Sequence, residues 1–204
     1  YDAETDMYFG MSVFYGYETG ALLNNLAIGN RVRIVGTVTY YETGGTWQVS
    51  GLAFREFKPN DPSNTTVVST GHSAGNDEVA PSVFADGTME LEVFTSLDSD
   101  ETVLKTFDYA ELIMSTSISM KNLQVLDAYT TNNGGNSDGA MTLTCKAADG
   151  SMIDVRTIVL RDEAGNLKVE ADYLNKTIDV IGIVDCFSGA YQIKVLTADD
   201  IVVH

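Results

Sequence analysis

Cysteine, histidine, proline and tryptophan are all scarce in this sequence of 204 residues. Two cysteines are too few for a disulfide-rich scaffold, and neither His72 nor His204 has a partner ligand at the spacing of a zinc site. No apolar run reaches the roughly 20 residues that a transmembrane helix needs. We therefore expect no metal, no cofactor and no membrane-spanning segment.

Basic side chains are the second shortage. Only 12 lysines and arginines stand against 29 aspartates and glutamates, which gives a net charge of −17. Such a charge repels nucleic-acid phosphates and anionic lipid headgroups, because binding to both depends on cationic side chains. It disfavours nucleic acid as a partner, and favours a neutral or cationic partner or one bridged by metal ions.

The N-terminal residues, Tyr1 to Thr5, include neither an initiator methionine nor a basic segment followed by an apolar one. We expect the chain to come from a longer precursor, whose targeting signal lies outside this sequence. A lipid anchor on a segment absent from this sequence is one option.

Strand signals, by contrast, are abundant. Alternating runs of β-branched and aromatic residues are separated by turns rich in Gly, Asn and Asp. The fold class that these runs predict is all-β with minor helix. Predicted strands cover residues 7–15, 31–40, 46–52, 87–94, 118–130, 140–147, 152–160, 177–187 and 190–196, and short helices cover residues 19–26 and 107–114.

Composition divides the chain into three parts. A stretch rich in Pro, Asn and Asp at residues 57–64 ends a first unit, residues 1–62. Residues 63–117 form an acidic connecting segment. Residues 118–204 form a second unit, whose five strands with one short helical segment between the third and fourth follow the order of an OB barrel.

An internal repeat links the two units. The run from Ile34 to Val38 matches the run from Val180 to Val184, each with a central glycine, and Trp47-Gln48-Val49 matches Tyr191-Gln192-Ile193. A glycine is expected where a barrel strand coils sharply. The first unit would then be an OB-like five-stranded barrel that lacks its opening strand or is completed by another segment, with 89–94 as the candidate.

This pattern, closing with Ala198-Asp199-Asp200-Ile201, resembles the OB-like modules of exported lipoproteins and extracellular nuclease-associated proteins of gut bacteria. The resemblance covers residues 118–203 well and residues 7–57 in part. It implies an accessory or binding unit. Fold alone does not fix an activity.

One short motif points to chemistry. Gly71-His72-Ser73-Ala74-Gly75 satisfies the G-x-S-x-G pattern of hydrolases, which works only on a strand-to-helix turn with an acid and a histidine later in the chain. No helix is predicted after it, and the later histidine is His204. We interpret the motif as a linker and expect no catalytic residues.

Cys145 and Cys186 each fall on the apolar register of a predicted strand. An apolar interior suits both a disulfide and a pair of buried thiols, so both alternatives stay open.

Aromatic residues are the candidate ligand-binding residues. An OB barrel binds ligands on strands two and three and in two of its loops. The rings flanking these places stack on bases or sugars in some proteins and pack the barrel in others. They are Tyr40, Tyr41 and Trp47 in the first unit and Tyr129, Phe187 and Tyr191 in the second.

We therefore predict a non-catalytic binding or scaffolding module of a secreted or envelope-anchored bacterial protein, with a protein or glycan partner. One alternative is a nucleic-acid-binding accessory region of an extracellular nuclease, for which the only basic grouping is Arg31, Arg33, Arg55 and Lys58. A second alternative is a carbohydrate-binding module that uses the aromatic loops.

Overall fold

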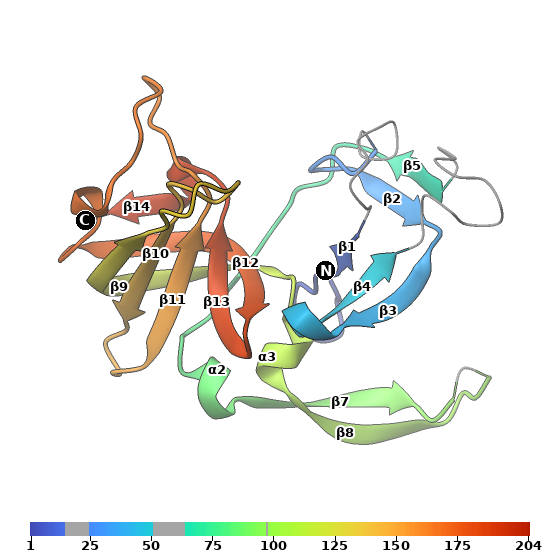
Figure 1. Cartoon of the computed structure of the whole chain (residues 1–204). Coiled ribbons are helices and arrows are strands. Elements are labelled where there is room, and N and C mark those ends of the chain that lie inside the picture. Colours follow the sequence, from blue (N-terminus) through green and yellow to red (C-terminus); the bar gives the residue numbers. More distant parts are fainter. Residues whose placement is uncertain (15–24, 51–63, 97) are drawn as a thin grey trace.

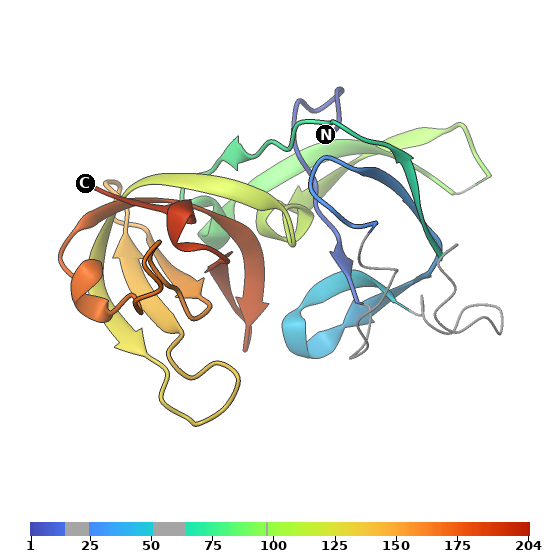
Figure 2. The same cartoon turned by 90° about the horizontal axis from the view of Figure 1, so that it is seen from above.

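The computed structural model describes residues 1–14, 25–50, 64–96 and 98–204. Within these residues the chain is mostly β-sheet with two short α-helices, so the all-β class with minor helix is confirmed. Figures 1 and 2 show two β lobes side by side, with a long hairpin projecting from the segment that connects them. We call β1 to β5 the first lobe and β9 to β14 the second lobe.

The second lobe contains the longest strands and the most extensive pairing. β9 pairs with β10, β10 with β11, β11 with β13 in parallel, β13 with β12, and β12 again with β9. The early part of β9 pairs with β12 and its later part with β10. The strands are β9 (Ser117–Thr130), β10 (Met141–Lys146), β11 (Met152–Thr157), β12 (Thr177–Phe187), β13 (Ala190–Val195) and β14 (Ile201–Val203), with 3-10 turns at Glu170–Asp172 and Ala198–Asp200.

Alternation along these strands explains the core. In β10 and β11 every second side chain is buried, as expected for strands with one face toward a core. The buried apolar cluster includes Met120, Leu143, Val155 and Ile193, all without measurable exposure. This packing makes the second lobe the hydrophobic centre of the molecule.

The first lobe is built from shorter strands and pairs differently. β1 lies parallel to β4, β4 antiparallel to β3, and β2 antiparallel to β5. Among its described residues no apolar side chain reaches full burial. The strands are β1 (Ser12–Val13), β2 (Arg31–Ile34), β3 (Thr37–Tyr41), β4 (Thr46–Ser50) and β5 (Thr65–Ser69), with a 3-10 turn, η1, at Glu42–Gly44.

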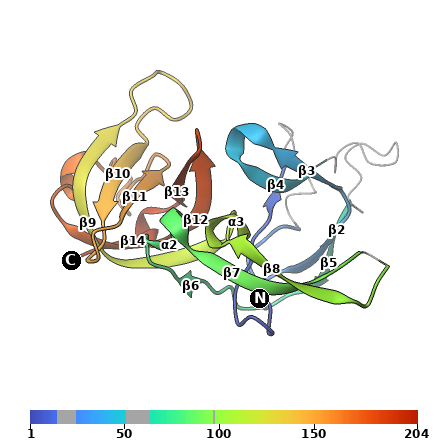
Figure 3. The same ribbon diagram turned by 90° about the horizontal axis from the view of Figure 1, so that it is seen from below.

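The connecting segment holds a short strand, two helices and the projecting hairpin. β6 pairs in parallel with the start of β9, while β7 pairs with β8 along all seven residues. Figure 3 shows the hairpin extending from α2 and α3 past the N-terminal segment. The elements are β6 (Asp77–Glu78), α2 (Val83–Asp86), β7 (Thr88–Phe94), β8 (Thr102–Asp108) and α3 (Tyr109–Leu112).

Several predicted elements differ from the observed ones. The predicted strand 7–15 is reduced to β1, and the predicted strand 31–40 is split into β2 and β3 around Gly36. The segment at 89–94 forms β7, whose strand partner within the described residues is β8, not a strand of the first lobe. β5 lies beyond residue 62 yet pairs with β2, so the pairing of the first lobe extends past the predicted boundary. The predicted helix 19–26 lies mainly outside the described residues.

No helix in the described ranges is both long and apolar enough to cross a bilayer.

Candidate functional site

Outward-facing side chains of the second lobe line up across neighbouring strands. Residues directly opposite each other in a sheet point to the same face, so the register defines two adjacent rows. The first row joins Tyr129, Thr142, Arg156 and Lys194. The second row joins Asp127, Thr144, Asp154, Gln192 and Asp185.

Hydrogen bonds hold both rows in place. The Arg156 guanidinium donates to Thr142 Oγ1 at 3.0 Å. In the second row, Thr144 Oγ1 donates to Asp154 Oδ1 at 2.9 Å and Gln192 Nε2 donates to Asp185 Oδ2 at 2.8 Å. These bonds fix donors and acceptors in advance of any ligand, which lowers the ordering cost of binding.

A cavity of about 300 Å³ opens over these rows. Its walls include Arg156 and Lys194 from the first row and Asp185 and Gln192 from the second. Phe187, at the end of β12, is 70% exposed and forms another part of the wall. Side chains of both charges and an exposed ring therefore meet in one place.

The six predicted aromatic residues separate into different environments. Phe187 lines the cavity, and Tyr129 lies on the row of Arg156. Tyr41 packs over its own hairpin turn, close to Gly44. The remaining three take part in two separate ring contacts: Tyr40 pairs with Trp47 in the first lobe, and Tyr191 pairs with Phe84.

The ring centroids of Tyr40 and Trp47 are 5.2 Å apart, and those of Phe84 and Tyr191 are 5.5 Å apart. Burial, followed by nearby negative charges, raises the pKa of Tyr191 to about 12. The sequence analysis did not single out Phe84. This residue comes three positions after Pro81 and lies in a four-residue helix, so no long periodic pattern marks it.

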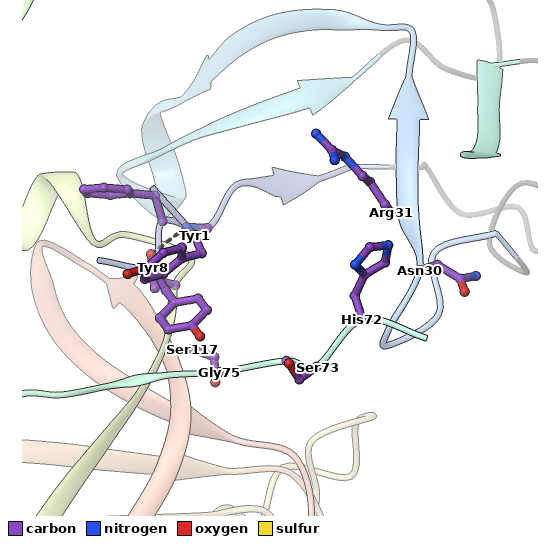
Figure 4. Close-up of a pocket in the computed structure, with 12 residues that line it drawn as sticks. Tyr1, Tyr8, Asn30, Arg31, His72, Ser73, Gly75 and Ser117 are labelled. Atoms are coloured by element: carbon purple, nitrogen blue, oxygen red, sulfur yellow. Dashed lines mark hydrogen bonds between the residues drawn. The ribbon is translucent and has the colours of Figure 1, made fainter. Parts of the chain in front are cut away.

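A larger cleft, of about 640 Å³, lies between the N-terminal segment and the chain around β2 and β5 (Figure 4). It contains His72 and Ser73 of the G-x-S-x-G motif, together with Arg31, Tyr1 and Tyr8. The sequence did not predict this cleft, because residues far apart in the chain form it.

The geometry of the motif differs from that of a hydrolase nucleophile. Ser73 is followed by β6 and not by a helix. His72 Nε2 lies 2.7 Å from Ser69 Oγ, whereas no hydrogen bond joins His72 to Ser73 in the described residues. No carboxylate is among the described residues that line the cleft. A nucleophile needs a base that is itself oriented by a third group, and this arrangement lacks that group here.

Cys145 and Cys186 are free thiols in the structure, so the disulfide alternative is not formed. Cys145 is fully buried and Cys186 half-buried. Burial, with a smaller contribution from Asp154, raises the pKa of Cys145 to about 12, which suits an inert core thiol.

Of the predicted basic grouping, Arg31 and Arg33 lie on β2 with both side chains exposed. Arg55 and Lys58 lie outside the described residues. Searching for metal sites in the described residues finds no cluster of three or more His, Cys, Asp or Glu side chains.

Comparison with protein-family models, curated proteins and solved structures finds no match to this chain.

Proposed function

We propose that this chain is a non-catalytic binding module of a secreted or envelope-anchored bacterial protein, and that its ligand is an oligosaccharide. The ligand would lie on the outward face of β10, β11 and β13, beside Phe187. The main support for the proposal is that one cavity combines the exposed ring of Phe187 with charged and polar side chains, among which Arg156 and Asp185 are held by hydrogen bonds.

The pairing of the second lobe supports an OB-like barrel. Its five main strands pair in the order β9, β10, β11, β13, β12 and back to β9, with one parallel contact, β11 to β13. In an OB barrel, ligands bind on the face of the second and third strands and in the loop after the first. Here that loop contributes Asn136 and Ser137 to the cavity.

The pairing of the first lobe supports a repeat of the same unit. β1 lies parallel to β4 as β11 lies parallel to β13, with Ser12 opposite Gln48 and Asp154 opposite Gln192. β2 pairs with β5 as β12 pairs with β14. The described part of the first lobe thus has counterparts of β11 to β14 but not of β9 and β10, which suits an OB-like unit without its opening strands.

The chemistry of the face favours sugar over nucleic acid. A sugar ring offers C–H groups to an aromatic face and hydroxyls that both donate and accept, which matches Arg156, Gln192 and Asp185. A phosphate backbone would meet the second row, where Asp127, Asp154 and Asp185 repel it. Export and envelope anchoring rest on the resemblance of the sequence to modules of exported proteins.

The test is a glycan array probed with the whole chain, followed by calorimetry on the strongest ligand. Phe187→Ala should weaken binding roughly 5- to 100-fold, if a sugar ring gains about as much from stacking on an aromatic side chain as the roughly 1–3 kcal/mol that a base gains. Phe94→Ala is the matched control, since Phe94 is similarly exposed at 66% but lies on the β7–β8 hairpin.

Two outcomes would replace the proposal. Binding of single-stranded oligothymidylate at physiological salt, lost in Arg156→Gln, would favour the nuclease-accessory alternative. Turnover of any substrate that one point substitution abolishes would make the chain an enzyme.

A further inference from the structure

The cleft of Figure 4 is chemically unlike the rest of this acidic chain. Acidic residues outnumber basic ones 29 to 12 in the sequence, yet the described residues that line the cleft include Arg31 and His72 and no carboxylate. Two acids outside the lining accept hydrogen bonds from residues of its wall. Asp77 Oδ2 accepts the backbone N–H of Tyr8 at 2.9 Å, and Asp6 accepts the hydroxyl of Tyr1.

Pairing between β2 and β5 places His72 beside Arg31. Arg31 lies opposite Ser69 in the sheet, and Ser69 Oγ is 2.7 Å from His72 Nε2. The backbone N–H of His72 donates to the carbonyl of Gly29 at 3.0 Å, just before β2 begins. These bonds fix the imidazole and leave its Nδ1 as the nitrogen that a ligand would meet.

The opposite side of the cleft is aromatic. Figure 4 shows Tyr8 and Tyr1 facing the side that carries Arg31 and His72, with Ser73 and Gly75 between them. The ring centroids of Tyr1 and Tyr8 are 5.0 Å apart, and Tyr8 packs directly against Gly75. The ring of a ligand would pack on this side of the cleft, and an anionic group of the same ligand would bind on the other side.

We propose that this cleft binds a small organic oxyanion, a phosphate, sulfate or carboxylate carried on an aromatic or sugar ring. The oxyanion lies between the Arg31 guanidinium and the His72 imidazole, and the ring lies against Tyr8. A guanidinium presents paired N–H donors that match two oxygens of such a group, and the volume of about 640 Å³ is within the usual range of small-molecule sites.

The probe is phenyl phosphate, titrated into the whole chain and followed by the Arg31 Nε–H signal in NMR spectra. Inorganic phosphate tests the anion without the ring, and phenol tests the ring without the anion. Phenyl sulfate and benzoate distinguish among the three oxyanions. We expect phenyl phosphate to bind at least ~10-fold more tightly than inorganic phosphate or phenol, because the two sides of the cleft act together.

Arg31→Gln should weaken phenyl phosphate binding at least ~10-fold, because it removes a charge-assisted hydrogen bond. Arg33→Gln removes the same charge from the same strand, but Arg33 is not among the residues of the cleft. Binding should therefore be unchanged in Arg33→Gln. His72→Gln, which keeps a polar group near Ser69, should give an intermediate loss.

Equal losses in Arg31→Gln and Arg33→Gln would overturn the proposal, since they would indicate general attraction of anions to β2. Undiminished binding in Arg31→Gln would overturn it as well. This site lies away from the Phe187 cavity, so its failure would leave the oligosaccharide proposal standing, and the reverse also holds.

Discussion

Gly45 of the first lobe lies against Cys186 of the second. A β-carbon on Gly45 would come within 3.2 Å of the Cys186 sulfur. Nearby, the hydroxyls of Thr46 and Ser115 are 3.2 Å apart. The β3–β4 turn therefore docks on β12 through a contact that is tight for an added β-carbon.

Gly45→Ala should destabilise the protein through two separate effects. Gly45 has φ +58°, a left-handed conformation that costs an alanine roughly 1–2 kcal/mol, and crowding against Cys186 adds about 1 kcal/mol more. Urea denaturation measures the sum. Gly134→Ala is the control, because Gly134 has φ +66° with nothing within 4 Å of its added carbon.

Adding Cys186→Ala to Gly45→Ala should recover the crowding part of the loss and leave the conformational part. Equal destabilisation in Gly45→Ala and Gly134→Ala, with no recovery, would mean that the turn does not press on β12.

The two thiols should react at very different rates. Cys145 is buried and its pKa is raised to about 12, so at about pH 8 it holds almost no thiolate. Cys186 is half-buried and more accessible. Mass spectrometry after iodoacetamide treatment should find one label on the folded chain and two on the unfolded chain without any reductant. An unfolded chain that takes up no label until it is reduced would instead contain a disulfide.

Much of the second lobe could be predicted from the sequence. Period-two alternation predicted β9 to β13 within one or two residues at most ends, because one face of each strand is buried. β5 and β8 were missed. Thr102–Asp108 exposes six of its seven side chains, and Thr65–Ser69 contains three hydroxyl residues among its five, so neither sequence shows a clean alternation of apolar and polar residues. Where burial does not select residues, the sequence carries little strand signal.

The candidate sites were harder to predict than the strands. Phe187 was found because it ends a strand beside a turn. Arg156 and Lys194 were missed because their proximity depends on the parallel register of β11 and β13. The sequence of one strand does not determine its register with another. Arg31 and His72 meet for a similar reason, through a pairing between strands separated by more than 30 residues.

Acid should weaken the second lobe through Asp179. Burial alone would raise the pKa of this carboxyl, but hydrogen bonds from the Asn122 N–H, Lys121 and His204 outweigh burial and lower the pKa. A carboxyl with a lowered pKa stabilises the folded state above its ordinary value of 3.8 and loses that contribution as the pH falls through the folded value.

Asp179→Asn should therefore lower the free energy of unfolding by about 1 kcal/mol at neutral pH. The difference from the unaltered chain should narrow as the pH falls through the lowered pKa of this carboxyl, because the native side chain then also becomes neutral. Asp199→Asn makes the same charge change at an exposed position and should have little effect at either pH. If the difference in free energy of unfolding stayed constant from neutral to acid pH, Asp179 would contribute through its packing and not through its charge.

Gly182 tests how tightly the strands of the second lobe close on one another. A β-carbon there would come within 2.5 Å of Ile193 Cγ2 and 2.9 Å of the Lys194 carbonyl oxygen, both on β13. Since Lys194 belongs to the proposed ligand face, a shift of β13 would disturb that face as well.

Gly182→Ala should cost about 1–3 kcal/mol of stability by overpacking. It should also weaken oligosaccharide binding. Gly189→Ala, in the turn before β13, meets nothing within 4 Å and should leave the core packing intact, so its loss of stability should be only the roughly 1–2 kcal/mol that a left-handed φ of +83° costs an alanine. If Gly182→Ala were as stable as the unaltered chain, β12 and β13 would have to lie further apart than this packing requires.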